Sequence, residues 1–395
     1  MSEEYKQYYK KWLSGLESEI VFWKSYMEEQ GGIYFYGYEK TISPNRKFEL
    51  EDEIPIENFG KDYSFVDVGS GPFSRCGNIT NKVRLQALSL DPLANIYKIL
   101  KEENHINNGI RIEMGFVELL SKYFPENAFD MVHMSNSLDH CFDAVYGIFQ
   151  LLYICKIGGK VILRHCENEA RRENYEGLHQ WNLSLHNDEN TFIIWRGKKR
   201  YNISKIFRKY ADIELYPDCV EDEGGWVFNK VVMTKKQNIL IPYIDYSNDM
   251  LISTYDFMLQ LILKKIEEKY RRGLSWTDTI CQKLKKIFYE PGEFISKIEG
   301  KNISSIDIYG GGILGIALYQ LLKKCDIQVG QLIDRNTILH DGRETICFEK
   351  YIPYSNMSMI VITVRNGRES IKELLQTKIE SHKIMYIDDF LHNFQ

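Results

Sequence analysis

The segment Phe65-Val-Asp67-Val-Gly69-Ser-Gly71-Pro72 decides the fold of the N-terminal half of this chain. It begins with apolar residues typical of a buried strand, and the two glycines follow where such a strand turns into a helix. Glycine lets the backbone bend sharply at that point and approach a ligand closely. We therefore predict a ligand-binding turn at the carboxyl end of a parallel strand.

Strands and helices are expected to alternate around this turn. The expected strands are 64–68, 85–90, 110–114, 129–134 and 160–164, and the helices between them include 92–103 and 142–156. The Gly158-Gly159 pair is predicted to turn the chain into the fifth strand. Further strands are expected at 191–195, 213–216 and 226–234, the last two as an antiparallel pair at the edge. This alternation predicts an α/β fold with a doubly wound, Rossmann-like sheet.

The residues after the other strands indicate which ligand the turn binds. Asp91 follows the second strand, where a carboxylate can accept hydrogen bonds from ribose hydroxyls. The acidic Asp67 precedes the first glycine by two positions, and this segment has no GxGxxG, which favours S-adenosylmethionine over a dinucleotide. Val117 and Glu118 are placed to flank the adenine. The predicted cofactor site consists of Asp67, Gly69, Ser70, Gly71, Asp91, Pro92, Val117, Glu118 and Asn136.

As a set, these residues resemble the class I S-adenosylmethionine-dependent methyltransferases, in which an acidic-x-Gly-x-Gly loop holds the methionine and ribose end of the cofactor. The resemblance covers roughly residues 60–235. The sequence departs from the commonest pattern because Pro72-Phe73 replaces a third glycine. The resemblance implies S-adenosylmethionine as the cofactor.

Polar residues gather where the fourth and fifth strands end and in the segment that follows them. In an open α/β sheet, ligands bind beyond the carboxyl ends of the strands. If the methyl acceptor is a hydroxyl, a base must remove its proton, and histidine suits that role. We predict His140 and His179 as bases, Asp139 as the group that orients a histidine, and His165 as a further member of the catalytic group. His133 lies within an apolar strand and is predicted to be structural.

Two other interpretations of this polar edge remain open. A divalent metal can polarise an acceptor hydroxyl. Its ligands would be some of Asp139, His140, His165, Glu169 and His179, although no HxH or HExxH spacing supports a metal site directly. Alternatively, the histidines cap strands and bind backbone groups.

Several motifs also resemble a group of bacterial methyltransferases found with surface-polysaccharide genes. These motifs are Glu19-Ile-Val-Phe-Trp23, Asp91–Ala94, Asn136–His140, and the run from Asn168 to Asn182. The resemblance implies O-methylation of a sugar, such as a nucleotide-linked heptose, in capsular polysaccharide biosynthesis. It places Glu169, Gln180, Trp181 and Asn182 at the acceptor.

A second glycine loop occurs near the C-terminus, in Ser305-Ile-Asp-Ile-Tyr-Gly310-Gly-Gly312-Ile-Leu-Gly315. A strand, GxGxxG and a helix follow one another there, and Asp334 ends the next strand, which is the spacing of a dinucleotide fingerprint. The unit resembles small Rossmann-like modules appended to sugar-modifying enzymes, which implies that Gly310 and Gly312 contact a nucleotide portion of the acceptor. A structural or oligomerising domain is the alternative.

Two further functions are alternatives to methyl transfer. An NAD-dependent oxidoreductase or epimerase would use the second loop, but no Tyr-x-x-x-Lys pair follows it. A non-catalytic scaffold that senses the cofactor is the third interpretation, and the dense polar edge at 135–182 argues against it.

Length and composition set the remaining expectations. A chain of 395 residues is too long for one ordinary core, and we predict an N-terminal helical segment at 1–58, a methyltransferase domain at 59–240, a helical connector at 241–300 and a second α/β domain at 301–395.

The net charge of -5 is spread along the chain, which argues against nucleic-acid binding. No apolar run approaches the ~20 residues of a membrane span. Scattered cysteines without CxxC and no signal peptide favour the cytoplasm. The aromatic helix expected at 5–29 is a candidate homo-oligomer interface.

Overall fold

The computed structural model forms two compact units, Met1–Asp245 and Tyr246–Gln395. The residues it describes are 3–32, 35–186, 191–218, 227–242, 254, 256–264, 275–334, 339–340, 343–353, 358–364 and 367–394. The finer boundaries at residues 58, 240 and 300 stay predictions. No helix in the described part of the chain is both long enough and apolar enough to cross a membrane.

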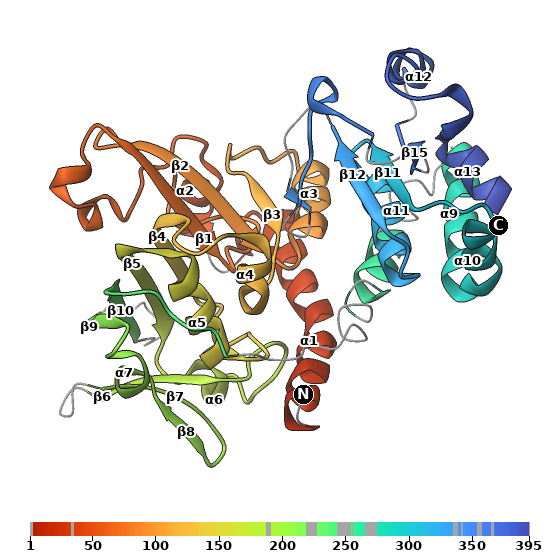
Figure 1. The fold of residues 1–395 in the computed structure, drawn as a ribbon. Helices are drawn as coiled ribbons and strands as arrows, with labels where there is room; N and C mark the ends of the chain where they lie inside the picture. Colours follow the sequence, from red (N-terminus) through yellow and green to blue (C-terminus); the bar gives the residue numbers. More distant parts are fainter. Residues whose placement is uncertain are drawn as a thin grey trace. The chain divides into compact units, whose positions relative to one another are not determined.

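The first unit is built on a seven-stranded sheet with the order β3-β2-β1-β4-β5-β10-β9 (Figure 1). The strands are β1 Asp62–Val68, β2 Arg84–Asp91, β3 Ile112–Met114, β4 Phe129–Ser135, β5 Cys155–Cys166, β9 Ala211–Asp218 and β10 Phe228–Lys235. The pairs from β3 to β5 are parallel, whereas β10 runs antiparallel to both β5 and β9. The predicted Rossmann-like sheet and its antiparallel edge pair are therefore confirmed.

Strand β1 occupies the centre of this sheet. Its residues Phe65–Val68 are buried, as expected for a strand covered on both faces. Phe65 pairs with Ala87 of β2 on one side and with Met131 of β4 on the other. From β1 the chain continues to β2 and β3 on one side of the sheet and then to β4 and β5 on the other side. This reversal of direction beside β1 is the topological switch point, where open α/β sheets bind ligands. The first glycine loop follows β1 directly at this point.

The described α-helices of the first unit are α1 Glu3–Glu28, α2 Phe35–Ile42, α3 Ala94–Glu103, α4 Leu120–Tyr123, α5 Ala144–Ile154, α6 Glu169–Arg172 and α7 Ile203–Phe207. Of these, α1, α3 and α5 begin and end close to the positions predicted at 5–29, 92–103 and 142–156. Helix α1 packs beside α3. It buries Trp12, Leu16 and Ile20 along one face, because apolar residues three and four apart lie above one another on a helix.

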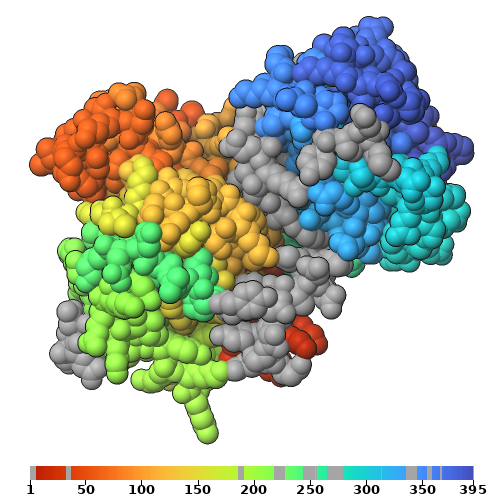
Figure 2. Space-filling model, viewed as in Figure 1, coloured from red at the N-terminus to blue at the C-terminus, as the bar shows by residue number. Residues whose placement is uncertain are grey.

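Two details of the first unit differ from the sequence prediction. Strand β5 begins at Cys155 rather than after the glycine pair, and Gly158 (φ 80°) lies within it near a register shift against β4. The strand predicted at 191–195 belongs to a separate antiparallel sheet, in the order β6-β7-β8. Its strands are β6 Asn182–His186, β7 Thr191–Arg196 and β8 Lys199–Asn202. The exposed β7–β8 turn projects from the surface of the unit (Figure 2).

The second unit contains a four-stranded parallel sheet in the order β12-β11-β15-β16. Its strands are β11 Ser305–Tyr309, β12 Val329–Ile333, β15 Ser358–Ile362 and β16 Ile384–Tyr386, with the short hairpin β13 Leu339–His340 and β14 Arg343–Glu344. Its helices are α9 Ser275–Tyr289, α10 Pro291–Gly300, α11 Ile313–Lys324, α12 Arg368–Leu375 and α13 Ile387–Phe394. The predicted strand-loop-helix around the second glycine loop is confirmed as β11 and α11.

The helical connector predicted at 241–300 is only partly covered by the described residues. Residues 256–264 are helical, and Leu259 and Ile262 are buried. Ile252, Tyr255, Ile266 and the basic residues Lys265, Arg271 and Arg272 lie outside the described residues.

Candidate active site

A cleft of about 940 Å³ lies at the carboxyl ends of β1, β2 and β4. All the residues predicted to bind the cofactor line this cleft. They are Asp67, Gly69, Ser70, Gly71, Asp91, Pro92, Val117, Glu118 and Asn136.

The glycine loop approaches its neighbours too closely for side chains. Gly69 (φ 65°) and Gly71 (φ 60°) have left-handed backbone conformations that favour glycine. A Cβ atom on Gly69 would overlap the side chain of Ser137, and one on Gly71 would lie 3.0 Å from the ring of Trp23. The loop is therefore confined between the turn after β4 and helix α1, which explains why glycine is needed at both positions.

Asp91 connects the end of β2 to this loop. Its Oδ2 accepts a hydrogen bond from the Gly71 N–H at 2.9 Å, and its Oδ1 accepts one from the Leu93 N–H at 2.8 Å. Burial raises the pKa of Asp91 to about 7, although these two backbone bonds favour the carboxylate. The side chain is thus held rigidly at the position predicted to bind the ribose.

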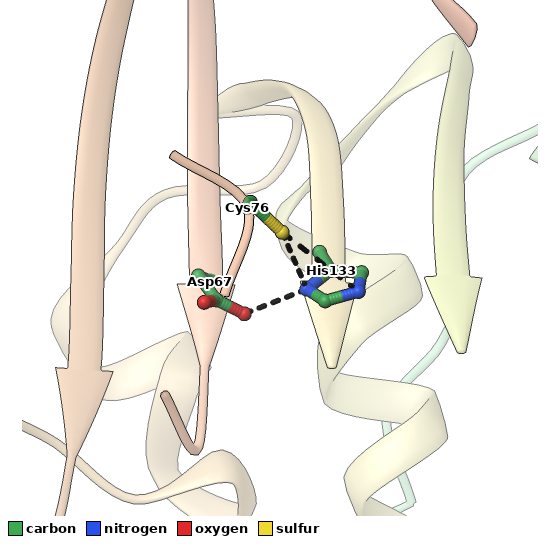
Figure 3. A group of neighbouring side chains, drawn as sticks. All are labelled: Asp67, Cys76 and His133. Carbon is green, nitrogen blue, oxygen red and sulfur yellow. Dashed lines mark hydrogen bonds and ion pairs between the residues drawn. The ribbon is translucent and has the colours of Figure 1, made fainter. Parts of the chain in front are cut away.

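Asp67 faces the neighbouring strand β4 (Figure 3). Its Oδ1 lies 2.7 Å from Nδ1 of His133, and its Oδ2 accepts a hydrogen bond from the Ser74 hydroxyl at 2.6 Å. The sulfur of Cys76 lies 3.2 Å from the same His133 nitrogen. Both carboxylate oxygens therefore have partners within the protein, so Asp67 supports the loop from beneath.

Helix α1 forms a wall of the cleft that the sequence analysis did not assign to the site. Trp12, Leu16, Glu19 and Trp23 line the cleft from this helix. The Trp23 indole N–H donates to Oε1 of Glu19 at 2.7 Å, which fixes both side chains. Their spacing of three and four residues places them on one face, and this pattern was visible in the sequence. It predicted a buried face without indicating what that face covers.

Acidic side chains dominate the charged lining of the cleft. Glu19, Asp67, Asp91 and Glu118 all belong to it, whereas Arg75 contributes a guanidinium at an exposed position. Burial raises the pKa of Glu118 to about 8, although the N–H groups of Phe142 and Asp143 donate to its Oε1. Ionised acids in such a lining attract a cationic ligand such as a sulfonium.

Asp139, His140 and His179 form what we call the histidine cluster, beside this cleft. Nδ1 of His179 lies 2.7 Å from Oδ2 of Asp139 and 3.2 Å from Nε2 of His140. The His140 Nε2 is 3.5 Å from the same Asp139 oxygen, and His140 itself lines the cleft. The structure thus brings together three residues predicted to be catalytic, two from the turn after β4 and one from a segment forty residues later.

The charges within the cluster shift one another's protonation. Burial opposes ionisation of His179, but the hydrogen bond and charge of Asp139 outweigh it and raise the pKa of His179 to about 9. Burial likewise opposes ionisation of Asp139, yet the neighbouring His140 and His179 lower the pKa of this carboxyl below its ordinary value. Asp139 and His179 therefore form a partly buried ion pair near neutral pH.

His165 and Glu169 lie next to the cluster. His165 is almost fully buried, and burial lowers its pKa to about 3, so that the ring is neutral. Burial raises the pKa of Glu169 to about 8, and the charge of Asp139 adds to this effect. Among the described residues, neither ring nitrogen of His165 nor Oε2 of Glu169 has a hydrogen-bond partner.

Known proteins similar to this chain include one curated sequence relative and several solved structures. No family model matches the chain. A curated relative, phosphoethanolamine N-methyltransferase of Plasmodium falciparum (isolate 3D7), is 24% identical over 207 residues, which cover 51% of this chain and 71% of the relative. The sequence relative supports a methyltransferase.

Two methyltransferases are among the solved structures similar to this chain. One is an S-adenosylmethionine-dependent methyltransferase from Mesorhizobium loti, with 15% identity, a TM-score of 0.30, and coverage of 47% of this chain and 95% of that one. The other is phosphoethanolamine N-methyltransferase 2 of Haemonchus contortus in complex with S-adenosyl-L-methionine. It has 16% identity, a TM-score of 0.33, and coverage of 51% of this chain and 56% of that one.

The structure places three predicted acceptor residues away from the cleft lining. Gln180, Trp181 and Asn182 are buried. Oε1 of Gln180 accepts from Arg196 at 2.9 Å, the Trp181 indole donates to the Cys141 carbonyl at 2.8 Å, and Oδ1 of Asn182 accepts from a backbone N–H at 2.8 Å. The N–H groups of Gln180 and Trp181 both donate to the Asp139 carbonyl. In this structure the segment therefore supports the histidine cluster from behind.

The second glycine loop borders a much smaller pocket within its own unit. That pocket has a volume of about 220 Å³ and is lined by Gly310 and Gly311 together with mainly apolar side chains. The Gly311 N–H donates to Oδ2 of Asp334 at 2.5 Å. A Cβ atom on Gly315 would collide with the Gly310 carbonyl, so this glycine serves close packing of α11 against the loop. Nucleotide contact by Gly310 and Gly312 stays a prediction.

Proposed function

We propose that this chain is an S-adenosylmethionine-dependent O-methyltransferase that acts on a hydroxyl of a sugar. The sugar is nucleotide-activated, for example a heptose, and the reaction belongs to surface or capsular polysaccharide biosynthesis. The observation that carries the proposal is the position of the histidine cluster beside a cleft formed by the glycine loop, Asp91 and helix α1.

The cleft offers a suitable partner for each part of the cofactor. Asp91 is fixed where it can accept hydrogen bonds from the ribose, and Val117 and Glu118 are placed to flank the adenine. Asn136 lines the cleft, and its buried Oδ1 has no hydrogen-bond partner among the described residues. A buried acceptor of this kind is satisfied when it binds a donor such as the methionine ammonium. Ionised acids in the lining favour the sulfonium charge.

The histidine cluster favours a hydroxyl acceptor. In the reaction the acceptor oxygen bonds to the methyl carbon as the carbon–sulfur bond breaks, and the electron pair of that bond remains on sulfur. A hydroxyl must lose its proton for the product to be neutral, so a group that takes or acidifies this proton speeds the reaction. His140, which lines the cleft beside the Asp139–His179 ion pair, is the candidate for such a group. That His140 and His179 act as bases stays a prediction.

Arg75 offers a contact for the nucleotide part of the acceptor. Its side chain lines the cleft, and its charge acts on Glu169 next to the histidine cluster. A guanidinium binds a phosphate through parallel N–H donors. A phosphorylated acceptor would therefore be held with its sugar near the cluster.

An amine acceptor is the second candidate, because the curated relative carries the name phosphoethanolamine N-methyltransferase. A neutral amine is more nucleophilic than a neutral hydroxyl, so once its ammonium proton is lost it has less need of a base during methyl transfer. The phosphate of such an acceptor could also bind Arg75. The two candidates differ in the atom that receives the methyl group.

A screen with a labelled methyl donor tests both candidates. The full chain is incubated with labelled S-adenosylmethionine and either nucleotide sugars or phosphoethanolamine, and the products are identified by mass spectrometry. We expect label on a sugar oxygen, reduced at least tenfold in His140→Ala. Label on phosphoethanolamine nitrogen, with none on any sugar, would replace the proposal by the second candidate. Failure to bind S-adenosylhomocysteine would refute both.

A further inference from the structure

The described residues contain two groups whose ligand atoms are close enough to hold one metal ion. One is Asp67, Cys76 and His133 beneath the glycine loop, shown in Figure 3, and the other is the histidine cluster. Both combine a carboxylate with imidazole nitrogen, which divalent transition metals accept as ligands. The two groups differ in their carboxylates: both oxygens of Asp67 have partners, whereas Oδ1 of Asp139 has none among the described residues.

The group beneath the glycine loop is satisfied without an ion. Both oxygens of Asp67 are hydrogen-bonded, one to Ser74 and the other to His133. The Cys76 thiol contacts the same histidine, and burial raises the pKa of this thiol well above its ordinary value. A thiol that stays protonated is a poor metal ligand, because the thiolate is the form that binds. This group therefore works as a buried hydrogen-bonded support.

The histidine cluster has the geometry of three ligands on one face of an ion. Its ligand atoms, Oδ2 of Asp139, Nδ1 of His179 and Nε2 of His140, are separated by 2.7, 3.2 and 3.5 Å. An ion about 2.1 Å from each ligand separates neighbouring ligand atoms by about 3.0 Å at right angles and about 3.4 Å at tetrahedral angles. The three observed separations, from 2.7 to 3.5 Å, lie around these values.

Unpartnered polar atoms provide an independent indication. Asp139 is 1% exposed, yet its Oδ1 has no hydrogen-bond partner among the described residues. The adjoining His165 is 3% exposed and lacks partners on both ring nitrogens, and Oε2 of Glu169 is also unpartnered. Buried polar groups are normally paired, and unpaired ones are accounted for by a bound ion or an ordered water.

We infer that the histidine cluster binds one divalent first-row transition-metal ion through Asp139, His140 and His179. Two imidazoles and one carboxylate on one face leave further coordination positions open. The open positions would face the acceptor.

The inference deepens the proposed function and rests on it for its catalytic consequence. An ion beside the cleft would bind the acceptor hydroxyl, most favourably through two neighbouring hydroxyls of a sugar, and would make the hydroxyl proton more acidic. The proton is lost to water, the freed electron pair forms the oxygen–methyl bond, and the carbon–sulfur bond of the donor breaks. The ion selects a hydroxylated acceptor, and it does not change oxidation state.

Binding of Co²⁺ to the full metal-free chain tests this site directly. Co²⁺ accepts the same ligands as Zn²⁺, and its visible absorption reports on the ligands and their geometry. We expect about one Co²⁺ per chain by equilibrium dialysis and a visible spectrum without a thiolate charge-transfer band. His140→Gln and His179→Gln should each weaken binding at least tenfold. S-adenosylhomocysteine binding by calorimetry shows whether these variants remain folded.

Two control variants localise the ion. Cys76→Ser removes the sulfur of the other group, and His105→Gln removes an exposed histidine outside the cleft lining. Both should retain Co²⁺ affinity within about twofold. A wild-type chain that binds no Co²⁺, retention of Co²⁺ by His179→Gln, or loss of Co²⁺ in Cys76→Ser with a thiolate band in the wild type would each overturn the inference.

The same samples separate this inference from the proposed function. Co²⁺ bound at the cluster without methyl transfer to any sugar would refute the function and leave the metal site intact. Sugar methylation that survives complete chelation, in a chain that binds no Co²⁺, would refute the metal site and leave the function intact.

Discussion

The two glycine loops of this chain are held by the same kind of hydrogen bond but differ in what surrounds them. In the first, Asp91 at the end of β2 accepts from the Gly71 N–H, and in the second, Asp334 after β12 accepts from the Gly311 N–H. The first loop borders a cleft of about 940 Å³, and the second borders a pocket of about 220 Å³. A glycine loop with a following acid therefore specifies a backbone turn, whereas the space for a ligand depends on elements from elsewhere in the chain.

Placing a side chain on each loop should produce the largest contrast. Gly69→Ala adds a Cβ atom at a left-handed position, where it overlaps Ser137, and we expect S-adenosylhomocysteine affinity to fall on the order of 100-fold because the loop must move. Gly312→Ala is the matched control, since its Cβ meets nothing within 4 Å. Calorimetry on both variants checks this. Equal affinities would show that the first loop does not contact the cofactor.

Neutralising the acid of each loop should give the next largest contrast. Asp91→Asn removes the charge that accepts from Gly71 and Leu93 and that is predicted to bind the ribose. Hydrogen bonds to charged groups contribute about 1.5–3 kcal/mol, so S-adenosylhomocysteine should bind about 10- to 100-fold more weakly. Asp334→Asn, measured in the same titration, should leave this affinity unchanged. A comparable loss in both variants would contradict separate roles for the loops.

The acidity of Asp91 should make cofactor binding depend on pH. Burial raises its pKa to about 7, so the fraction ionised rises from pH 6 to pH 8. A cationic ligand binds the carboxylate more strongly than the neutral acid, and affinity for S-adenosylmethionine should therefore increase with pH by up to about tenfold over this range. S-adenosylhomocysteine lacks the sulfonium charge and should show a smaller increase. Identical pH profiles for the two ligands would exclude a charge effect.

The wall formed by helix α1 should have the smallest effect. Trp23→Phe keeps an aromatic ring beside Gly71 but removes the indole N–H that donates to Glu19. A single hydrogen bond of this kind contributes about 1 kcal/mol, so S-adenosylhomocysteine should bind about 3- to 5-fold more weakly. Phe22→Leu, on the exposed side of the same helix, serves as the control. An equal loss in the control would indicate a general effect on the helix.

Local sequence patterns were sufficient to predict the sheet and both glycine loops. Buried strands are continuous apolar runs, and the residues that end parallel strands meet at one edge of the sheet. The convergence of Asp139 and His140 with the cofactor loop follows from this rule. The α1 wall could not be predicted, because the periodicity of Trp12, Leu16 and Trp23 shows which helix face is buried but not which surface covers it.

The segment after β5 illustrates a different limit of sequence analysis. His179 and Gln180 are adjacent and polar, and both were expected at the active site. In the structure His179 joins the cluster, whereas Gln180 is fully buried and bonded to Arg196. Outside regular helices and strands, no periodicity determines which way neighbouring side chains point. The roles of such residues depend on tertiary contacts that the chain makes only when folded.

The two segments that form the histidine cluster are linked by backbone as well as side-chain hydrogen bonds. The N–H groups of Gln180 and Trp181, which follow His179, both donate to the Asp139 carbonyl. The glycine loop lies against Trp23 of helix α1 and against Ser137 of the turn after β4, the turn that also carries Asp139 and His140. Helix α1 also contacts the segment before His179, because Lys11 donates to the Gly177 carbonyl at 2.8 Å. Helix α1 and the turn after β4 therefore each connect the predicted cofactor side of the cleft to the histidine cluster, so a substitution in either one would alter both sides.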